Sequence, residues 1–230
     1  MPRRNVIKEF CPDSWYHVYN RGVRGLKIFE DKRDKYTFLY LLKKYLDPDY
    51  REKKFDPVTG EPKYVRSNYV YEDAELLAFC LMPNHFHLLV KDISGKGTTM
   101  LMRRVVSNYA TYYNKESDTS GALFESTYKG VPITSEEQLL HVSRYIHLNP
   151  AELVDKLENY PFSSYPVYLG RKNVAWVKPK EILDCFGPTG IELEMASETG
   201  FNPVQTYRKF VESYQLTDEE KELVQSFSLQ

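Results

Sequence analysis

Two histidines, His85 and His87, stand on either side of one apolar residue within the nearly continuous apolar run 76–91. Successive side chains of a β-strand point to opposite faces, so both imidazoles would project from one face and Phe86 from the other. Two neighbouring imidazoles on a stiff strand form half of a metal site. Two core histidines that each have a hydrogen-bond partner would give the same pattern. The pair alone therefore leaves both interpretations open.

A second set of reactive side chains lies on a helix predicted at 135–148. Tyr145 and Asn149 are four residues apart and share one helix face. Asn149 could offer an amide oxygen to a divalent ion held by the imidazoles, with positions left open for phosphate and water. Tyr145 would then project toward the same ion, and a tyrosine hydroxyl can attack a phosphate that a metal polarises. Helical spacing by itself favours a core tyrosine, and the sequence order does not place this helix against the histidine strand.

The elements that must position these residues follow from periodicity and turn signals. Thr134-Ser-Glu-Glu predicts a helix start, and Pro150 predicts its end. Pro83 predicts a turn before the histidine strand. The polar insertion at 47–68 is predicted to be a long loop or a small hairpin. Strands are predicted at 15–20, 70–80, 84–91 and 123–133, and helices at 31–46, 98–114, 135–148, 201–214 and 217–227.

The order of these elements favours an α+β fold. The first six match the ferredoxin-like βαββαβ pattern, an antiparallel sheet with helices on one face. We expect a catalytic domain at 1–150 and a mostly helical C-terminal extension at 151–230. Tyrosines spaced along the helix at 98–114, including Tyr109 and Tyr113, favour core packing over a site.

Composition restricts the class of protein. The chain is 42% apolar, so it can build a core, and its net charge is −1, so an overall charge gives no argument for nucleic acid. Basic groups concentrate near the start and acidic groups near the end. Three scattered cysteines imply neither disulfides nor a cysteine zinc site. With no apolar run of ~18 residues, we expect a soluble, cytoplasmic protein without membrane contact.

Five stretches in order resemble one family. Met82-Pro-Asn-His-Phe-His-Leu-Leu-Val resembles the HUH motif (histidine, bulky apolar residue, histidine) of the single-tyrosine HUH transposases. The resemblance is strongest to the REP-associated tyrosine transposases of the insertion-sequence-200-type superfamily. It also rests on the stretches 16–22, 123–129, 144–150 and 160–165, and covers roughly residues 10–170.

The resemblance implies a metal-dependent single-stranded DNA endonuclease and strand transferase that cuts at the foot of a DNA hairpin. Tyr145 matches the nucleophile that keeps the 5′ end as a phosphotyrosine, and His85 and His87 match the metal-binding pair. Asn149 matches the third ligand, which is a glutamine in many relatives, so its reach is one methylene shorter. The implied ion is Mg²⁺ or Mn²⁺, and Zn²⁺ or Ni²⁺ could bind in a purified sample.

The expected partner is single-stranded or hairpin DNA, bound by a monomer or a homodimer, and the long tail favours a monomer. Arg21 and Arg24 flank Gly22 on a loop that suits either phosphate contacts or an ordinary surface turn. The candidates for contact with DNA phosphates are Arg21, Arg24, Arg104, Lys129 and Arg144.

Two other functions fit the same sequence. A non-catalytic or repurposed nucleic-acid-binding protein could use the same fold, since fold does not prove activity. A relaxase or replication-initiator type of HUH nickase is a weaker alternative, because no third histidine or second catalytic tyrosine stands in a recognisable place. Tyr113 is the one competitor for the nucleophile that we consider, and His17 is interpreted as a packed or surface histidine.

Overall fold

A four-stranded antiparallel sheet forms the centre of the protein, whose computed structural model describes residues 9–66, 69–187 and 202–213. Its strands lie in the order β4-β5-β1-β6, and every neighbouring pair is antiparallel. This is the strand order of the ferredoxin-like βαββαβ unit, and it confirms the predicted fold class. The strands are β1 (Ser14–Arg21), β4 (Ala74–Leu81), β5 (His85–Asp92) and β6 (Lys129–Ile133).

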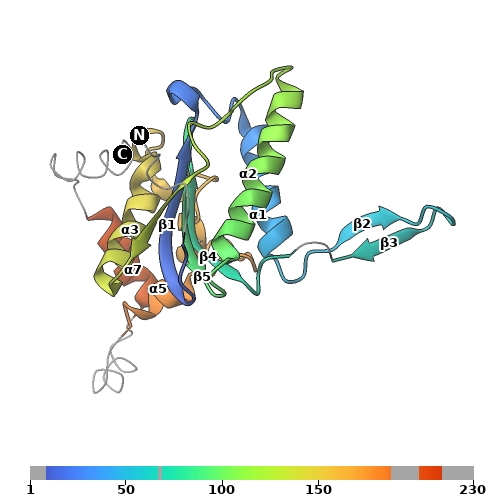
Figure 1. The fold of residues 1–230 in the computed structure, drawn as a ribbon. Helices are drawn as coiled ribbons and strands as arrows, with labels where there is room; N and C mark the ends of the chain where they lie inside the picture. Colours follow the sequence, from blue (N-terminus) through green and yellow to red (C-terminus); the bar gives the residue numbers. More distant parts are fainter. Residues whose placement is uncertain (1–8, 67–68, 188–201, 214–230) are drawn as a thin grey trace.

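Helices cover both faces of this sheet (Figure 1). The two helices of the βαββαβ unit, α1 (Lys32–Leu46) and α2 (Gly97–Glu116), lie together on one face, as predicted. The opposite face is covered by α3 (Glu136–Leu148), with α5 (Lys180–Asp184) and α7 (Pro203–Glu212) beside it. The helix that carries Tyr145 therefore packs on the face away from α1 and α2.

The remaining elements are short. The predicted insertion forms a hairpin of two strands, β2 and β3, which among the described residues pair only with each other. In the described part of the chain, no helix has the length and apolar character needed to cross a membrane. The short elements are the 3₁₀ turns Val23–Gly25, Asn149–Glu152 and Leu157–Asn159, the strands β2 (Glu52–Phe55) and β3 (Pro62–Val65), and α4 (Tyr165–Tyr168).

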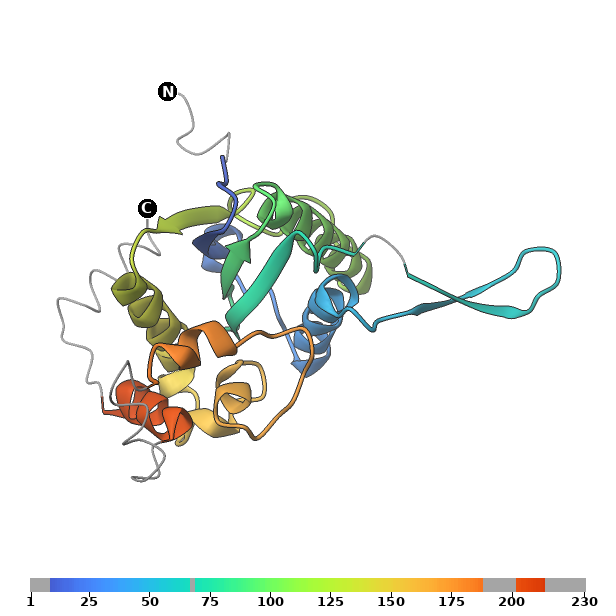
Figure 2. The ribbon, with the colours of Figure 1, turned by 90° about the horizontal axis from the view of Figure 1, so that it is seen from below.

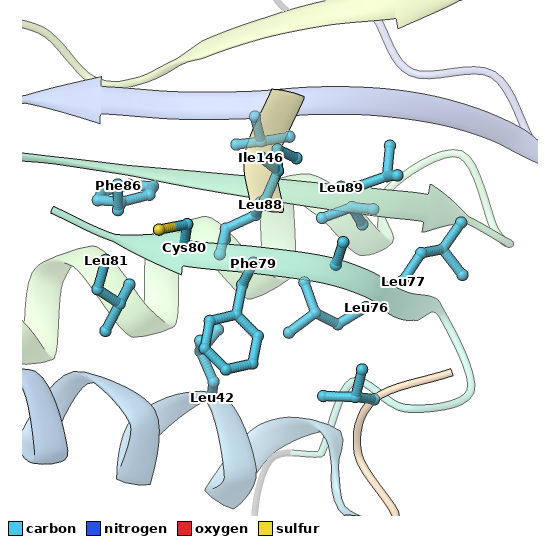
Figure 3. Close-up of a cluster of buried hydrophobic side chains, with 14 of the residues drawn as sticks. Leu42, Leu76, Leu77, Phe79, Cys80, Leu81, Phe86, Leu88, Leu89 and Ile146 are labelled. Atoms are coloured by element: carbon cyan, nitrogen blue, oxygen red, sulfur yellow. The ribbon is translucent and has the colours of Figure 1, made fainter. Parts of the chain in front are cut away.

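The core lies on both sides of β4 and β5 (Figure 3). Both strands are buried on two faces, which explains why they form nearly continuous apolar runs in the sequence. Neighbouring residues of β5 alternate between the two layers: Phe86 packs against Phe38 of α1, with ring centroids 5.0 Å apart. His87 instead lies against Tyr145 of α3, at 5.2 Å. The predicted alternation of the histidine strand is thus correct.

The helix starts agree with the capping signals in the sequence. Ser135 accepts a hydrogen bond from the backbone N–H of Gln138, and Asp31 accepts bonds from the first turn of α1. Asp92, fully buried, accepts bonds from three backbone N–H groups, one in the turn before α2 and two in its first turn. These caps fix the ends of the helices relative to the sheet.

One predicted strand is shorter in the structure, and one predicted helix lies outside the described residues. The strand predicted at 123–133 is wrong in its first half, because regular pairing begins only at Lys129. The side chain of Asn20 donates hydrogen bonds to the carbonyls of Ser126 and Thr127 and so replaces the strand ladder there. The helix predicted at 201–214 is confirmed as α7, whereas the one at 217–227 lies outside the described residues.

The stretch 160–168 covers the exposed edge of β4. Leu81 donates its backbone N–H to the carbonyl of Phe162, and Ser164 returns a backbone bond to the carbonyl of Phe79. The hydroxyls of Tyr160 and Tyr168 donate to carbonyls of the same strand. An open edge strand would offer unpaired backbone groups to other chains. The C-terminal segment therefore completes the sheet edge, while the predicted division at residue 150 stays a prediction.

Replacing Ser164 by alanine is expected to lower the free energy of unfolding by roughly 2–4 kcal/mol. The buried hydroxyl of Ser164 bonds to the backbone N–H of Phe79 at 2.9 Å and to Nε2 of His147 at 2.7 Å. Both groups would be left buried without this partner. Urea denaturation measures the change. Ser163→Ala is the matched control, because in the described part of the chain that hydroxyl accepts only a local bond from Tyr165. An equal loss in both variants would contradict the prediction.

Candidate functional site

The two predicted histidines lie on the sheet face that α3 covers. Their strand pairs with β1, so that His85 lies opposite Arg21 and His87 opposite Tyr19. The two imidazole rings are 5.0 Å apart between centroids and nearly perpendicular. His87 is buried and His85 is partly exposed, so one edge of the site opens to solvent.

His85 is oriented by a short hydrogen bond to its preceding residue. Its Nδ1 lies 2.7 Å from Oδ1 of Asn84, whose amide nitrogen donates to the carbonyl of Gly25. Nδ1 must therefore carry the proton, which leaves a lone pair on Nε2. That Nε2 lies 3.4 Å from Oδ1 of Asn149, whose amide nitrogen is engaged with the carbonyl of Tyr145. Two acceptors thus face each other, an arrangement that a cation between them would satisfy.

His87 is held between another histidine and the predicted nucleophile. Its Nδ1 lies 2.9 Å from Nε2 of His17, and its Nε2 lies 3.4 Å from the hydroxyl of Tyr145. Metal-binding histidines characteristically donate their second N–H to a neighbouring acceptor, which fixes the tautomer. With His17 as that acceptor, the lone pair on Nε2 points to the side where Tyr145 and Asn149 lie. The structure thus brings together all four residues predicted for catalysis and metal binding, within one chain.

Burial keeps these imidazoles neutral. Burial lowers the pKa of His17 to about 3, and it lowers the pKa of His87 well below its ordinary value, with His85 and His17 adding to the effect. The pKa of His85 is also lowered, mainly by burial. Neutral imidazoles are the form that binds metals. Among the described residues no three His, Cys, Asp or Glu side chains could hold an ion together, so an ion here would also need the amide oxygen of Asn149.

The arrangement agrees with the comparison with known protein families. The family model described as "Transposase IS200 like" matches residues 46–149, from the end of α1 to Asn149. The match confirms the resemblance to the IS200-like transposases. The matched residues include the histidine strand and the helix of Tyr145, whereas β1, with His17 and Arg21, lies outside the matched range. The comparison therefore supports a function of the transposase class.

Comparison with solved structures finds a REP-associated tyrosine transposase bound to a REP hairpin. The similarity covers 76% of this chain and 92% of that chain, at 12% sequence identity and a TM-score of 0.48. No curated protein shows significant similarity to the sequence.

Two of the basic residues predicted to contact DNA lie beside the histidine pair. Arg21 ends β1 directly opposite His85, and its charge contributes to the lowered pKa of that imidazole. Its guanidinium packs so closely on Gly25 that an added Cβ would lie 2.9 Å away, and its Nε is buried without a hydrogen-bond partner among the described residues. Arg24 is exposed in the following turn, with a positive φ of 56°. This loop therefore presents positive charge next to the imidazoles.

The other three basic residues have different surroundings. Lys129 begins β6 and lies over the ring of Tyr19, 5.5 Å from its centroid, on the same sheet face as the site. Arg144 is buried against α7, where its guanidinium stacks on Phe210 at 4.5 Å. Arg104 lies on α2, on the other face of the sheet, and donates to the carbonyl of Tyr69. Only part of the predicted basic set therefore gathers at the histidines, and its role in binding DNA stays a prediction.

His17 and Tyr19 are site residues that the sequence reasoning missed. Both lie on β1 and point to the same face as the histidine pair, and the ring of Tyr19 is 5.8 Å from that of His87. The available signal was the alternation of large side chains at 15–20, which places residues 17, 19 and 21 on one face. Burial, with the neighbouring Tyr145, raises the pKa of Tyr19 to about 12, which makes it a poorer nucleophile than an ordinary tyrosine.

Replacing His17 by phenylalanine is expected to weaken Mn²⁺ binding by about 10–100-fold. Phenylalanine keeps the ring but removes the acceptor for Nδ1 of His87, so the tautomer and orientation of His87 are no longer fixed. Isothermal titration calorimetry measures the affinity. His17→Gln retains an acceptor and should recover part of the loss, and a Phe variant that binds Mn²⁺ like the parent would contradict this role.

Proposed function

We propose that the protein is a metal-dependent single-stranded DNA endonuclease and strand transferase that cuts near DNA hairpins. One observation carries the proposal. The hydroxyl of Tyr145 lies 3.4 Å from Nε2 of His87, in the same chain, beside the facing acceptors of His85 and Asn149. A tyrosine so placed, next to lone pairs that suit a divalent ion, is what cleavage through a phosphotyrosine requires.

In the proposed reaction, Oη of Tyr145 forms a bond to the phosphorus of one phosphodiester as the P–O3′ bond breaks. The phenol loses its proton and the leaving oxygen gains one, so the products are a free 3′-OH and a 5′-phosphotyrosine. A second 3′-OH can reverse the step and join two strands. The covalent link conserves the energy of the phosphodiester, so no nucleotide cofactor is needed. Arg21 and Arg24 would position the neighbouring phosphates.

His85, His87 and Asn149 would hold the ion, Mg²⁺ or Mn²⁺, and Zn²⁺ or Ni²⁺ could replace it in a purified sample. Such an ion polarises the phosphate and stabilises the charge that develops on it. The other contribution of the protein is to orient these side chains. Asn84 and His17 bond to Nδ1 of His85 and His87 and so fix the two rings. The amide of Asn149 donates to the carbonyl of Tyr145, which links the proposed third ligand to the helix of the nucleophile.

A site made of residues from one chain supports action as a monomer. If the nucleophile came from an exchanged helix of a partner, Tyr145 would not need to lie against the imidazoles of its own chain. A homodimer with two complete sites would work in the same way. We propose that single-stranded DNA carrying a hairpin is the substrate, since the resemblance to the REP-associated branch implies cutting at a hairpin's foot.

The test is to incubate the purified chain with end-labelled hairpin DNA and Mn²⁺ and to separate the products on a denaturing gel. We expect a protein–DNA adduct that resists denaturation, together with a free 3′-OH product. Mass spectrometry of the adduct should locate the nucleotide on the peptide that contains Tyr145. Tight binding without any adduct, over a panel of hairpins, would instead favour the non-catalytic nucleic-acid-binding alternative.

A further inference from the structure

The hairpin of β2 and β3 projects from the body of the protein beyond the end of α1 (Figures 1 and 2). Within the described ranges, its strands pair only with each other and belong to no larger sheet. Isolated two-stranded ribbons are at best marginally stable in water. Phe55 and Tyr64 are 64% and 66% exposed on it, which is an aggregation hazard for an unpartnered ribbon. We call residues 52–65 the arm.

The base of the arm is firmly fixed. Arg66 stacks on Tyr69 and Tyr71, with its guanidinium 5.5 and 5.4 Å from the two ring centroids, and it donates to the hydroxyl of Tyr71. Arg104 donates to the carbonyl of Tyr69 from α2. At the first strand, Glu52 is bonded to Lys44 of α1 at 2.9 Å. The arm is therefore held out by specific contacts, and one of the basic residues predicted to bind DNA lies at its base.

One face of the arm carries lysines directly opposite each other. Lys54 and Lys63 are cross-strand partners. Like charges in such positions destabilise a ribbon, so this pairing favours an anionic partner. Of the nearby acids, Glu52 bonds to Lys44 and also lies 3.8 Å from Nζ of Lys54, and Asp56 accepts backbone bonds in the turn at the tip. The paired stretches 53–55 and 62–64 carry three lysines and no acid, so positive charge dominates the middle of the arm.

The other face combines apolar rings with a cation. Lys53 and Phe55 lie on it, with the ammonium group 5.2 Å from the ring centroid, and Tyr64 is the cross-strand partner of Lys53. Two strands of four residues are about 13 Å long at ~3.3 Å per residue. The major groove of B-DNA is about 12 Å wide and admits a two-stranded ribbon. Size, charge and exposed rings together fit duplex DNA.

We propose that the arm binds the duplex stem of the DNA hairpin, with Lys54 and Lys63 on its phosphates. The inference rests on the proposed function for its DNA partner. It assigns the arm a task separate from cutting, because its strands lie outside the sheet that carries His85 and His87. The arm would hold the folded stem while the single strand beside it reaches Tyr145.

The test compares the full chain with two arm variants, K54S/K63S and F55S/Y64S. Two fluorescent DNA probes are compared. The first is a hairpin whose stem has about 12 base pairs, slightly more than one helical turn, and the second is an unstructured single strand of equal length. We expect K54S/K63S to bind the hairpin about 5–20-fold more weakly than the parent and to bind the unstructured strand with the parent's affinity. The slope of the logarithm of hairpin affinity against the logarithm of salt concentration should become shallower by about 2. F55S/Y64S should also weaken binding to the hairpin.

The control is K156S/K172S, which removes two exposed lysines of the C-terminal segment and should bind both probes like the parent. Unchanged hairpin affinity in both arm variants would overturn the proposal, as would equal losses for hairpin and single strand. A change of sedimentation coefficient with normal DNA binding would show that the arm contacts a second copy instead. Covalent adducts are measured separately at saturating DNA. If no adduct forms, the proposed function is wrong, but the binding comparison still tests whether the arm contacts the hairpin stem.

Discussion

The Tyr145→Phe chain is expected to form no covalent adduct with hairpin DNA, while its affinity for that DNA changes by less than about threefold. The substitution removes one oxygen and keeps the ring against His87 and His17, so the packing of α3 on the sheet should survive. Binding depends on phosphate contacts elsewhere on the surface. Denaturing gels measure the adduct, and fluorescence anisotropy measures binding. Loss of the adduct with intact binding is the signature of a nucleophile.

Two other tyrosines provide matched controls. Tyr113, the competitor considered from the sequence, lies on α2 on the far face of the sheet and donates to Glu30. Tyr19 is close to His87, but its raised pKa makes it a poor substitute. Tyr113→Phe should therefore form the adduct at the parent's rate, and Tyr19→Phe should retain it. An adduct that persists in Tyr145→Phe and disappears in either control would move the nucleophile to that residue.

The part of the site that could be predicted is the part that secondary-structure periodicity determines. Alternation along β5 put His85 and His87 on one face, and a spacing of four put Tyr145 and Asn149 on one side of α3. Local signals such as the Ser135 cap set the helix boundaries. What periodicity could not supply was the contact between strand and helix, which depends on how α3 packs on the sheet. The family resemblance supplied that expectation.

Side-chain surroundings set by tertiary packing could not be predicted. His17 was interpreted as an ordinary histidine because its partnership with His87 depends on the pairing of β1 with β5, which the sequence does not reveal. Arg144 precedes the predicted nucleophile, yet one residue turns it by about 100° around the helix, and it packs on Phe210. The strand at 123–128 failed since side-chain bonds from Asn20 replaced the backbone ladder.

The two faces of the sheet differ in how far their side-chain contacts can be predicted from the sequence. On the side of α1 and α2, rings such as Phe29, Phe38 and Phe86 pack without specific polar geometry, and apolar periodicity is enough to predict them. On the side of α3, buried polar groups must each find a partner. His147 does so with Tyr207 and Ser164, at 2.7 Å each. The face that needs such matching is the one that presents the candidate site.

The His87→Ala chain is expected to cut DNA at least ~10³-fold more slowly than the parent, the effect of losing several kcal/mol of metal-based stabilisation. The substitution removes one of the two imidazole lone pairs that would hold the ion, and it leaves Nε2 of His17 without its partner. His87 is 1% exposed, so it cannot contribute much to contact with DNA, and binding should stay within about threefold of the parent.

Adduct formation at saturating DNA and Mn²⁺ measures the loss, and calorimetry should show weakened Mn²⁺ binding in the same variant. His141→Ala is the matched control, because this histidine lies on α3 but is exposed and bonds to Arg144 away from the site. It should cut and bind Mn²⁺ normally. Chelation of the parent with EDTA should reproduce the His87→Ala defect, since both remove the same ion. Cutting by His87→Ala at the parent's rate would show that the imidazole pair is a packing feature of the core and that catalysis depends on other groups.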